Sequence, residues 1–292
     1  MAPKRFLPAL YALCCMFLMA GCGSPSSSGT TGSNTPTPTV KRVASVPSSS
    51  LIQAGKLLIC SDIPSPPQEF YNAKGQVVGS DIDTGNDIAA RLGLHTEWVN
   101  SVFDTIILAV TTGKCDIVIS GQNITPARVK QVEMIPYFSA GQTFVVRKGN
   151  PDGVTNNPMT LCGKKVAVQL GATEQVTAQQ YSKQCTAAGK PSITLLISQK
   201  SSDALQQVQT GHAVAFFQDS PVAAYYVKQQ PSVFQTAGGV IAPIDEGISV
   251  PYTNPKLVRA VKKALKSMET DGTYRRILVK WGEQGIKVPA IM

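Results

Sequence analysis

The chain has 292 residues, of which 43% are hydrophobic and 15% charged, and its mean hydropathy is +0.02. This is enough apolar sequence to bury a substantial core, which argues against a disordered protein, a bare peptide or a disulfide-stapled miniprotein. The formal charge of +9 comes from 27 Lys and Arg against 18 Asp and Glu, and it raises the question of a nucleic-acid or anionic membrane partner.

The distribution of the basic residues argues against nucleic acid. The densest run comprises Arg259, Lys262, Lys263 and Lys266. Apolar residues at helical spacing between 257 and 268 predict that this run forms the solvated face of an amphipathic helix. No nucleic-acid partner is therefore expected.

The N-terminus resembles an export signal. Lys4 and Arg5 precede an apolar run over 6–20 that is too short to span a bilayer. The run ends in LMAGCGS (18–24), which resembles a bacterial lipobox, so residues 1–21 are predicted as a lipoprotein signal peptide and Cys22 as the lipidated residue. The alternative is an ordinary signal peptide with an incidental cysteine. On either interpretation the mature chain works outside the cytoplasm.

A polar segment follows the predicted anchor. Between residues 23 and 50, 21 of 28 residues are Ser, Thr, Pro or Gly. Such a composition buries too little apolar surface to offset its ordering entropy, so residues 22–50 are predicted to form a flexible tether to the membrane. Removal of the signal leaves 25 basic and 18 acidic residues, a charge of +7.

Four cysteines lie beyond the tether: Cys60, Cys115, Cys162 and Cys185. An even number outside the cytoplasm predicts two disulfides, and three pairings are possible. The positions of the cysteines favour Cys60 with Cys115, both at the starts of strands, and Cys162 with Cys185 across a short excursion. A zinc site is the alternative, but there is no close CxxC pair and both histidines are remote, so no metal is expected.

Helices and strands alternate along the body. A helix is predicted up to Gly93, and another from Asp104 to Gly113 leads into a strand at 117–119. The helix, Thr-Gly, strand pattern recurs from Asp203 through Gly211, which predicts two lobes of similar α/β build. Polar residues follow both strands, and ligands bind outside such strand ends in open α/β sheets.

Catalytic motifs are scarce. The chain has two histidines and no GxSxG, HExxH or phosphate-binding glycine loop, so an enzyme is the weaker hypothesis and no cofactor is expected. Arg128 and Asp219 instead suit a zwitterion. A guanidinium binds an α-carboxylate bidentately while a carboxylate accepts the α-ammonium.

Several sequence blocks resemble family 3 of the bacterial extracellular solute-binding proteins, the polar amino-acid receptors of ABC importers. They occur in the order expected: CSDIPSPPQEF (60–70), GQVVGSDID (75–83), FDTIILA (103–109), GKCDIVISGQNITPAR (113–128), YF (137–138), VAVQLGATEQ (166–175), FFQDSPVAAY (216–225) and DGTYRRILVKW (271–281). The resemblance implies a two-lobed periplasmic-binding-protein-like α/β fold of type II, with a two-segment hinge. We assign 51–143 plus 244–292 to lobe 1 and 145–240 to lobe 2.

The resemblance also implies how the ligand head group is bound. Arg128 matches the arginine that receives the carboxylate, and Thr173 matches a backbone donor at a helix start, where anions bind readily. Gly121 and Asn123 match positions that contact the head group. Asp219 matches the acceptor of the α-ammonium.

The residues expected around the ligand side chain depart from the family pattern. Phe103 matches an aromatic cover and Asp62 a carboxylate at the far end of the ligand, but a second aromatic is missing from the Pro-rich turn. Asp62 and Glu174 together favour a cationic side chain, whereas Asp62 and Gln169 also suit an amide. Ser120 completes the predicted ligand-binding set.

The expected function is that of a monomeric, lipid-anchored extracytoplasmic receptor that delivers a polar L-amino acid to an ABC transporter permease. One alternative is a ligand-sensing lipoprotein that acts on a membrane signalling partner. The other is a dehydratase-type enzyme on the same fold, for which Glu174 is the best acid or base.

Overall fold

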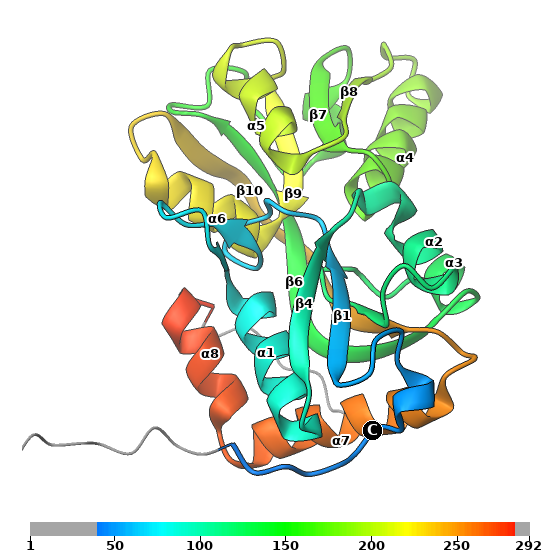
Figure 1. The fold of residues 1–292 in the computed structure, drawn as a ribbon. Helices are drawn as coiled ribbons and strands as arrows, with labels where there is room; N and C mark the ends of the chain where they lie inside the picture. The colour runs from blue at the N-terminus through cyan, green and yellow to red at the C-terminus, as the bar shows by residue number, and fades with distance from the viewer. Residues whose placement is uncertain (1–39, 284–292) are drawn as a thin grey trace, which may run out of the picture. The chain divides into compact units, whose positions relative to one another are not determined.

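The structure, a computed structural model, describes residues 40–283 apart from the side chain of Ala242. The predicted signal peptide (1–21) and Cys22 lie outside these residues. One eight-stranded sheet runs through the described chain in the order β4-β1-β5-β10-β6-β9-β7-β8 (Figure 1). A separate two-stranded sheet pairs β2 (Phe70–Tyr71) with β3 (Val77–Val78).

The first lobe contains the strands at one end of the large sheet. Three of them are parallel, as expected when helices connect them: β1 (Lys56–Ser61), β4 (His95–Asn100) and β5 (Ile117–Val118). Its helices are α1 (Ser80–Leu92), α2 (Ile106–Thr111), α3 (Pro126–Val129), α7 (Pro255–Thr270) and α8 (Thr273–Trp281), with 3-10 turns at Ser48–Ser50 and Phe103–Thr105.

The second lobe repeats this build. Its three parallel strands are β7 (Lys165–Gln169), β8 (Thr194–Ser198) and β9 (Ala215–Asp219). Its helices are α4 (Thr173–Ala187), α5 (Ser201–Gln209) and α6 (Ser220–Gln229), with a 3-10 turn at Pro158–Leu161. The recurrent Thr-Gly step lies at the same place in both lobes, because Gly113 and Gly211 have φ values of +80° and +77° after α2 and α5.

Two long antiparallel strands connect the lobes. β6 (Glu133–Arg147) and β10 (Phe234–Val250) pair along most of their length, and their register shifts between Ala237 and Ile244. Both strands also pair with lobe strands, β10 with β5 and β6 with β9. The predicted pair of crossings therefore corresponds to this two-stranded ribbon.

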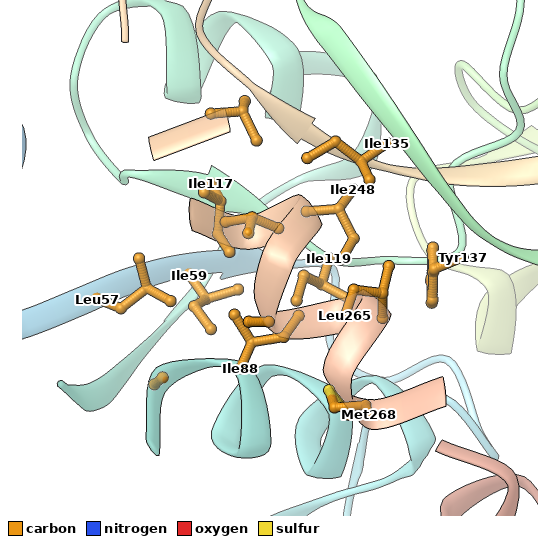
Figure 2. Close-up of a cluster of buried hydrophobic side chains, with 14 of the residues drawn as sticks. Leu57, Ile59, Ile88, Ile117, Ile119, Ile135, Tyr137, Ile248, Leu265 and Met268 are labelled. Carbon is orange, nitrogen blue, oxygen red and sulfur yellow. The ribbon is translucent and has the colours of Figure 1, made fainter. Parts of the chain in front are cut away.

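Alternation along the strands divides the first-lobe core into two layers. Leu57 and Ile59 of β1 face α1, α7 and α8, as Figure 2 shows for Ile88, Leu265 and Met268, whereas Leu58 and Cys60 face α2. The second lobe follows the same rule, with Val166 and Val168 packed on the α4 side. Ala167 faces α5 and α6.

Helix α7 is the amphipathic helix predicted from the basic run. The Asn254 side chain accepts a hydrogen bond from the Leu257 N–H at 3.2 Å, and Pro255 occupies the first turn, so the local sequence defines the start of the helix. Its apolar stripe is buried apart from the partly buried Val258, while Arg259, Lys263 and Lys266 are exposed and Lys262 is half-buried.

Residues 40–50 pack against the body, whereas the composition predicts a tether as far as residue 50. The Val43 N–H donates to the Arg91 carbonyl at 2.8 Å, Val46 is buried in the first-lobe core, and Asn254 binds the Ser50 carbonyl. The four apolar residues among 40–46 outweigh the surrounding serines and prolines. The ordered body thus begins earlier than the sequence composition indicates.

Both favoured disulfides are confirmed. Cys60 pairs with Cys115 and Cys162 with Cys185, with Cα separations of 5.7 and 5.5 Å. Cys60 lies near the end of β1 rather than at its start, and Cys115 precedes β5. Within residues 40–283, no helix combines the length and the apolar character needed to cross a bilayer.

We predict that Leu265→Ala lowers the free energy of unfolding by about 2–5 kcal/mol, because the removed atoms leave a cavity in the packed first-lobe core. Urea unfolding measures the change. Lys263→Ala, on the exposed face of the same helix, is the matched control and should change stability by less than about 0.5 kcal/mol. Equal effects of the two substitutions would contradict this packing.

Candidate functional site

Both lobes line a small cavity at the carboxyl ends of β1, β5, β7 and β9. The cavity has a volume of about 20 Å³, which is room for roughly one water molecule. Its lining residues are Asp62, Ser65, Gln68, Glu69, Phe103, Ser120, Gly121, Asn123, Gln169, Ala172, Glu174, Gln218, Asp219 and Val222. Four of them carry carboxyl groups.

The second lobe contributes two buried carboxyl groups that contact each other. Glu174 lies in the first turn of α4, and Asp219 ends β9 directly before α6. Burial raises the pKa of Glu174, and burial together with the negative charge of Glu174 raises the pKa of Asp219 well above its usual value. One oxygen of each has no hydrogen-bond partner among the described residues.

The first lobe contributes Asp62 and Glu69. Asp62 follows β1 and accepts a hydrogen bond from Gln169 Nε2; burial raises its pKa to about 6. Glu69 accepts a hydrogen bond from Ser120 Oγ at 2.8 Å, and burial beside Asp81 raises its pKa well above its usual value. The second oxygen of Glu69 has no partner within residues 40–283.

Arg128 lies at the edge of this acidic cavity. The Thr125 side chain caps α3 by accepting the Arg128 N–H, and Pro126 occupies the first turn, which fixes the backbone of the arginine. Its guanidinium donates to the Asn123 carbonyl at 2.8 Å and to the Gly171 carbonyl at 3.1 Å, and it lies 5.3 Å from the Phe103 ring centre. Burial lowers the pKa of Arg128.

Three polar contacts bridge the two lobes around the cavity. Gln169 Nε2 binds Asp62, and Arg128 binds the Gly171 carbonyl. Thr173 Oγ1 donates to Asn123 Oδ1 at 2.6 Å. The two halves of the cavity therefore bind each other through hydrogen bonds.

Most of the predicted site residues come together in the structure. Eight line the cavity: Asp62, Phe103, Ser120, Gly121, Asn123, Gln169, Glu174 and Asp219. Arg128 and Thr173 lie outside its lining, although both contact Asn123. The backbone N–H of Gly121, expected near the ligand head group, donates to Asp81 Oδ2 at 3.0 Å.

Six lining residues were not predicted: Ser65, Gln68, Glu69, Ala172, Gln218 and Val222. Gln218 and Ala172 are adjacent in sequence to predicted residues, so proximity alone could have indicated them. Gln68 Nε2 donates to the fully buried Glu246 at 2.7 Å across a separation of 178 residues, and no local pattern signals that contact.

The acidic lining of the cavity favours an organic cation over a neutral ligand. Four buried carboxyl groups line the cavity, and a single guanidinium lies at its edge. Among residues 40–283, no group of three or more His, Cys, Asp or Glu side chains is placed to hold a metal ion. A ligand with one or two ammonium or guanidinium groups would neutralise the acidic lining.

The family model for the bacterial extracellular solute-binding proteins, family 3, matches residues 57–284. The arginine-binding protein ArgT of Corynebacterium glutamicum is 28% identical over 99% of this chain and 96% of its own length. The putative ABC transporter arginine-binding protein 2 of Escherichia coli K12 is 29% identical over 74% of this chain and 86% of its own length.

Solved structures agree with this similarity. An ancestral arginine-binding protein bound to arginine is 38% identical, with a TM-score of 0.71 over 78% of this chain and 98% of its own. The ancestral amino acid-binding protein AncCDT-1, a precursor of cyclohexadienyl dehydratase, is 36% identical, with a TM-score of 0.71 over 78% of this chain and 95% of its own. The two-lobed α/β fold predicted from the sequence is confirmed.

We predict that Asp62→Asn stabilises the protein at neutral pH. Burial raises the pKa of Asp62 to about 6, so its ionisation destabilises the folded state at neutral pH. At pH 4 the folded protein holds Asp62 in its protonated form, and this cost is small. The substitution should add about 1–3 kcal/mol to the free energy of unfolding at pH 7 and little at pH 4, as measured by urea unfolding. Asp245→Asn, at an exposed position, is the control; a gain at both pH values would contradict the assignment.

Proposed function

Because the chain belongs to family 3 of the bacterial extracellular solute-binding proteins, we propose that it is a receptor for a cationic L-amino acid, arginine in the first place, which it delivers to an ABC importer. The observation that carries the choice of ligand is the acidic cavity, with four carboxyl groups against one guanidinium. The relatives named as arginine-binding proteins support the same choice.

The two ends of the amino acid would bind opposite sides of the cavity. Arg128 and the N–H groups at the start of α4 are suited to the α-carboxylate, since both attract anions. Asp219 and Glu174 would accept the α-ammonium. The guanidinium of the ligand would then extend toward Asp62 and Glu69 in the first lobe.

Binding would require the lobes to separate and close again. A cavity of about 20 Å³ is far below the 300–1,000 Å³ typical of small-molecule sites. The bridging contacts of Gln169, Arg128 and Thr173 would give way to ligand contacts, and β6 and β10 would act as the hinge. We propose lobe boundaries of 51–143 plus 244–292 and 145–240, with residues 40–50 added to the first lobe.

Attachment to the membrane is part of the same proposal. The lipobox-like sequence at Cys22 and the polar segment that follows it favour a lipid-anchored monomer held outside the cytoplasm near its permease. The relatives carry names of transport binding proteins, which favours an importer subunit over a sensor or a dehydratase.

We predict that Arg128→Ala weakens L-arginine binding by roughly 30-fold or more. Loss of one partner of a desolvated charge pair typically removes about 2–5 kcal/mol of binding free energy. Isothermal titration calorimetry provides the measurement. Arg276→Ala, on the exposed face of α8, is the matched control and should bind as the unmodified protein does.

Either of two results would contradict the proposal. An unchanged affinity after Arg128→Ala would remove the carboxylate role of Arg128. The absence of heat and of any thermal shift with arginine, lysine and the other common amino acids would remove the receptor function itself.

A further inference from the structure

Glu174 and Asp219 present an electrostatic conflict that ligand contacts alone do not explain. Both side chains are buried, with exposed fractions of 1% and 7%, and their carboxyl groups lie in contact. Two neighbouring carboxyl groups in a desolvated site cannot both be ionised without a large cost in free energy. Glu174 Oε1 and Asp219 Oδ1 also lack partners among the described residues.

The positive charge of Arg128 acts on both carboxyl groups, but neither forms an ion pair within residues 40–283. The guanidinium of Arg128 is committed to the carbonyls of Asn123 and Gly171, and none of the ion pairs within residues 40–283 includes Glu174 or Asp219. Thr173, whose hydroxyl lies 3.3 Å from Glu174 Oε2, is uncharged. The charged groups that face the pair or its cavity are Arg128 from α3, Glu246 from β10, and Asp62 and Glu69 from the first lobe; Lys200 and Asp104 act on Asp62.

We propose that Glu174 and Asp219 share one proton when the cleft holds no ligand, and that the α-ammonium group of the incoming amino acid replaces this proton. The O–H bond of the Asp219 carboxyl breaks, the proton leaves to solvent, and ligand N–H groups then donate to both carboxylates. One positive charge, the proton, is exchanged for another, the ammonium group, so the net charge at the pair is the same before and after binding. This inference rests on the proposed function for the identity of its ligand.

The shared proton links binding to pH. Protonation of the pair competes with the ligand, so the apparent affinity should fall by up to about tenfold per pH unit below the pKa of the pair, where one proton is released per ligand. Burial raises the pKa of both carboxyl groups, so the pair stays protonated to a higher pH than ordinary carboxyl groups do. A receptor of this kind would lose its ligand on acidification while its fold remained intact.

Titration calorimetry with L-arginine in buffers of different ionisation enthalpy tests the inference. At pH 7 the unmodified protein should release about one proton per arginine, because the pair is protonated once before binding. Glu174→Gln should reduce the release to nearly zero at whatever affinity remains. Glu97→Gln, at an exposed position on β4, is the control and should leave the release unchanged.

Three results would overturn the inference. The unmodified protein could release no proton on binding arginine, or Glu174→Gln could release as many protons as the unmodified protein. Loss of proton release in Asp62→Asn would also overturn it. These results are distinct from failure of the proposed function, in which arginine produces no heat at all. If arginine does not bind, the protonation state of the pair can still be measured in the protein without ligand. Carbon-13 NMR of labelled carboxyl groups should show one proton on the pair at pH 7, and two ionised carboxylates would overturn the inference.

Discussion

The burial of carboxyl groups that form no ion pair within residues 40–283 is the constraint on which the rest of this structure depends. Asp62, Glu69, Glu174 and Asp219 line one cavity, and desolvation raises the pKa of each. Groups of this kind oppose folding, because their charged forms lose hydration without gaining an ion pair. The cationic ligand that we propose would supply the missing positive charge and the missing donors.

The topology of the sheet determines how the two lobes around these carboxyl groups are connected. β6 and β10 are shared by both lobes, so a continuous hydrogen-bonded ribbon joins them. Their facing surfaces meet through a few polar contacts and through the rings of Phe70 and Tyr225, whose centres lie 5.5 Å apart. Such contacts exchange readily for ligand contacts of similar strength, since each contributes only about 1 kcal/mol net. The apolar cores remain within the lobes, where opening does not disturb them.

Sequence patterns predicted the features that depend on local periodicity or on short spacings. Gly93 ends α1 with φ of +72°, and both disulfides join the cysteines expected. The sequence patterns did not predict features that depend on contacts between distant segments. These are the packing of residues 40–50 and the contact between Gln68 and Glu246. The sequence predicts a ligand-binding role for Arg128, but the direction of the guanidinium depends on the carbonyl of Gly171, which belongs to the other lobe.

The departure of the Pro-rich turn from the family pattern has a physical meaning in this cavity. Ser65 and Gln68 line it where a second aromatic is expected, and Phe103 is the one aromatic side chain among the lining residues that the structure describes. Gln68 packs so closely on Gly121, which has φ of +52°, that a Cβ atom there would lie 2.8 Å from its Oε1. Arg128 lies over the Phe103 ring, 5.3 Å from its centre, and the same ring lines the cavity. In the proposed function, charge and hydrogen bonding to Asp62 and Glu69 would therefore select a cationic side chain.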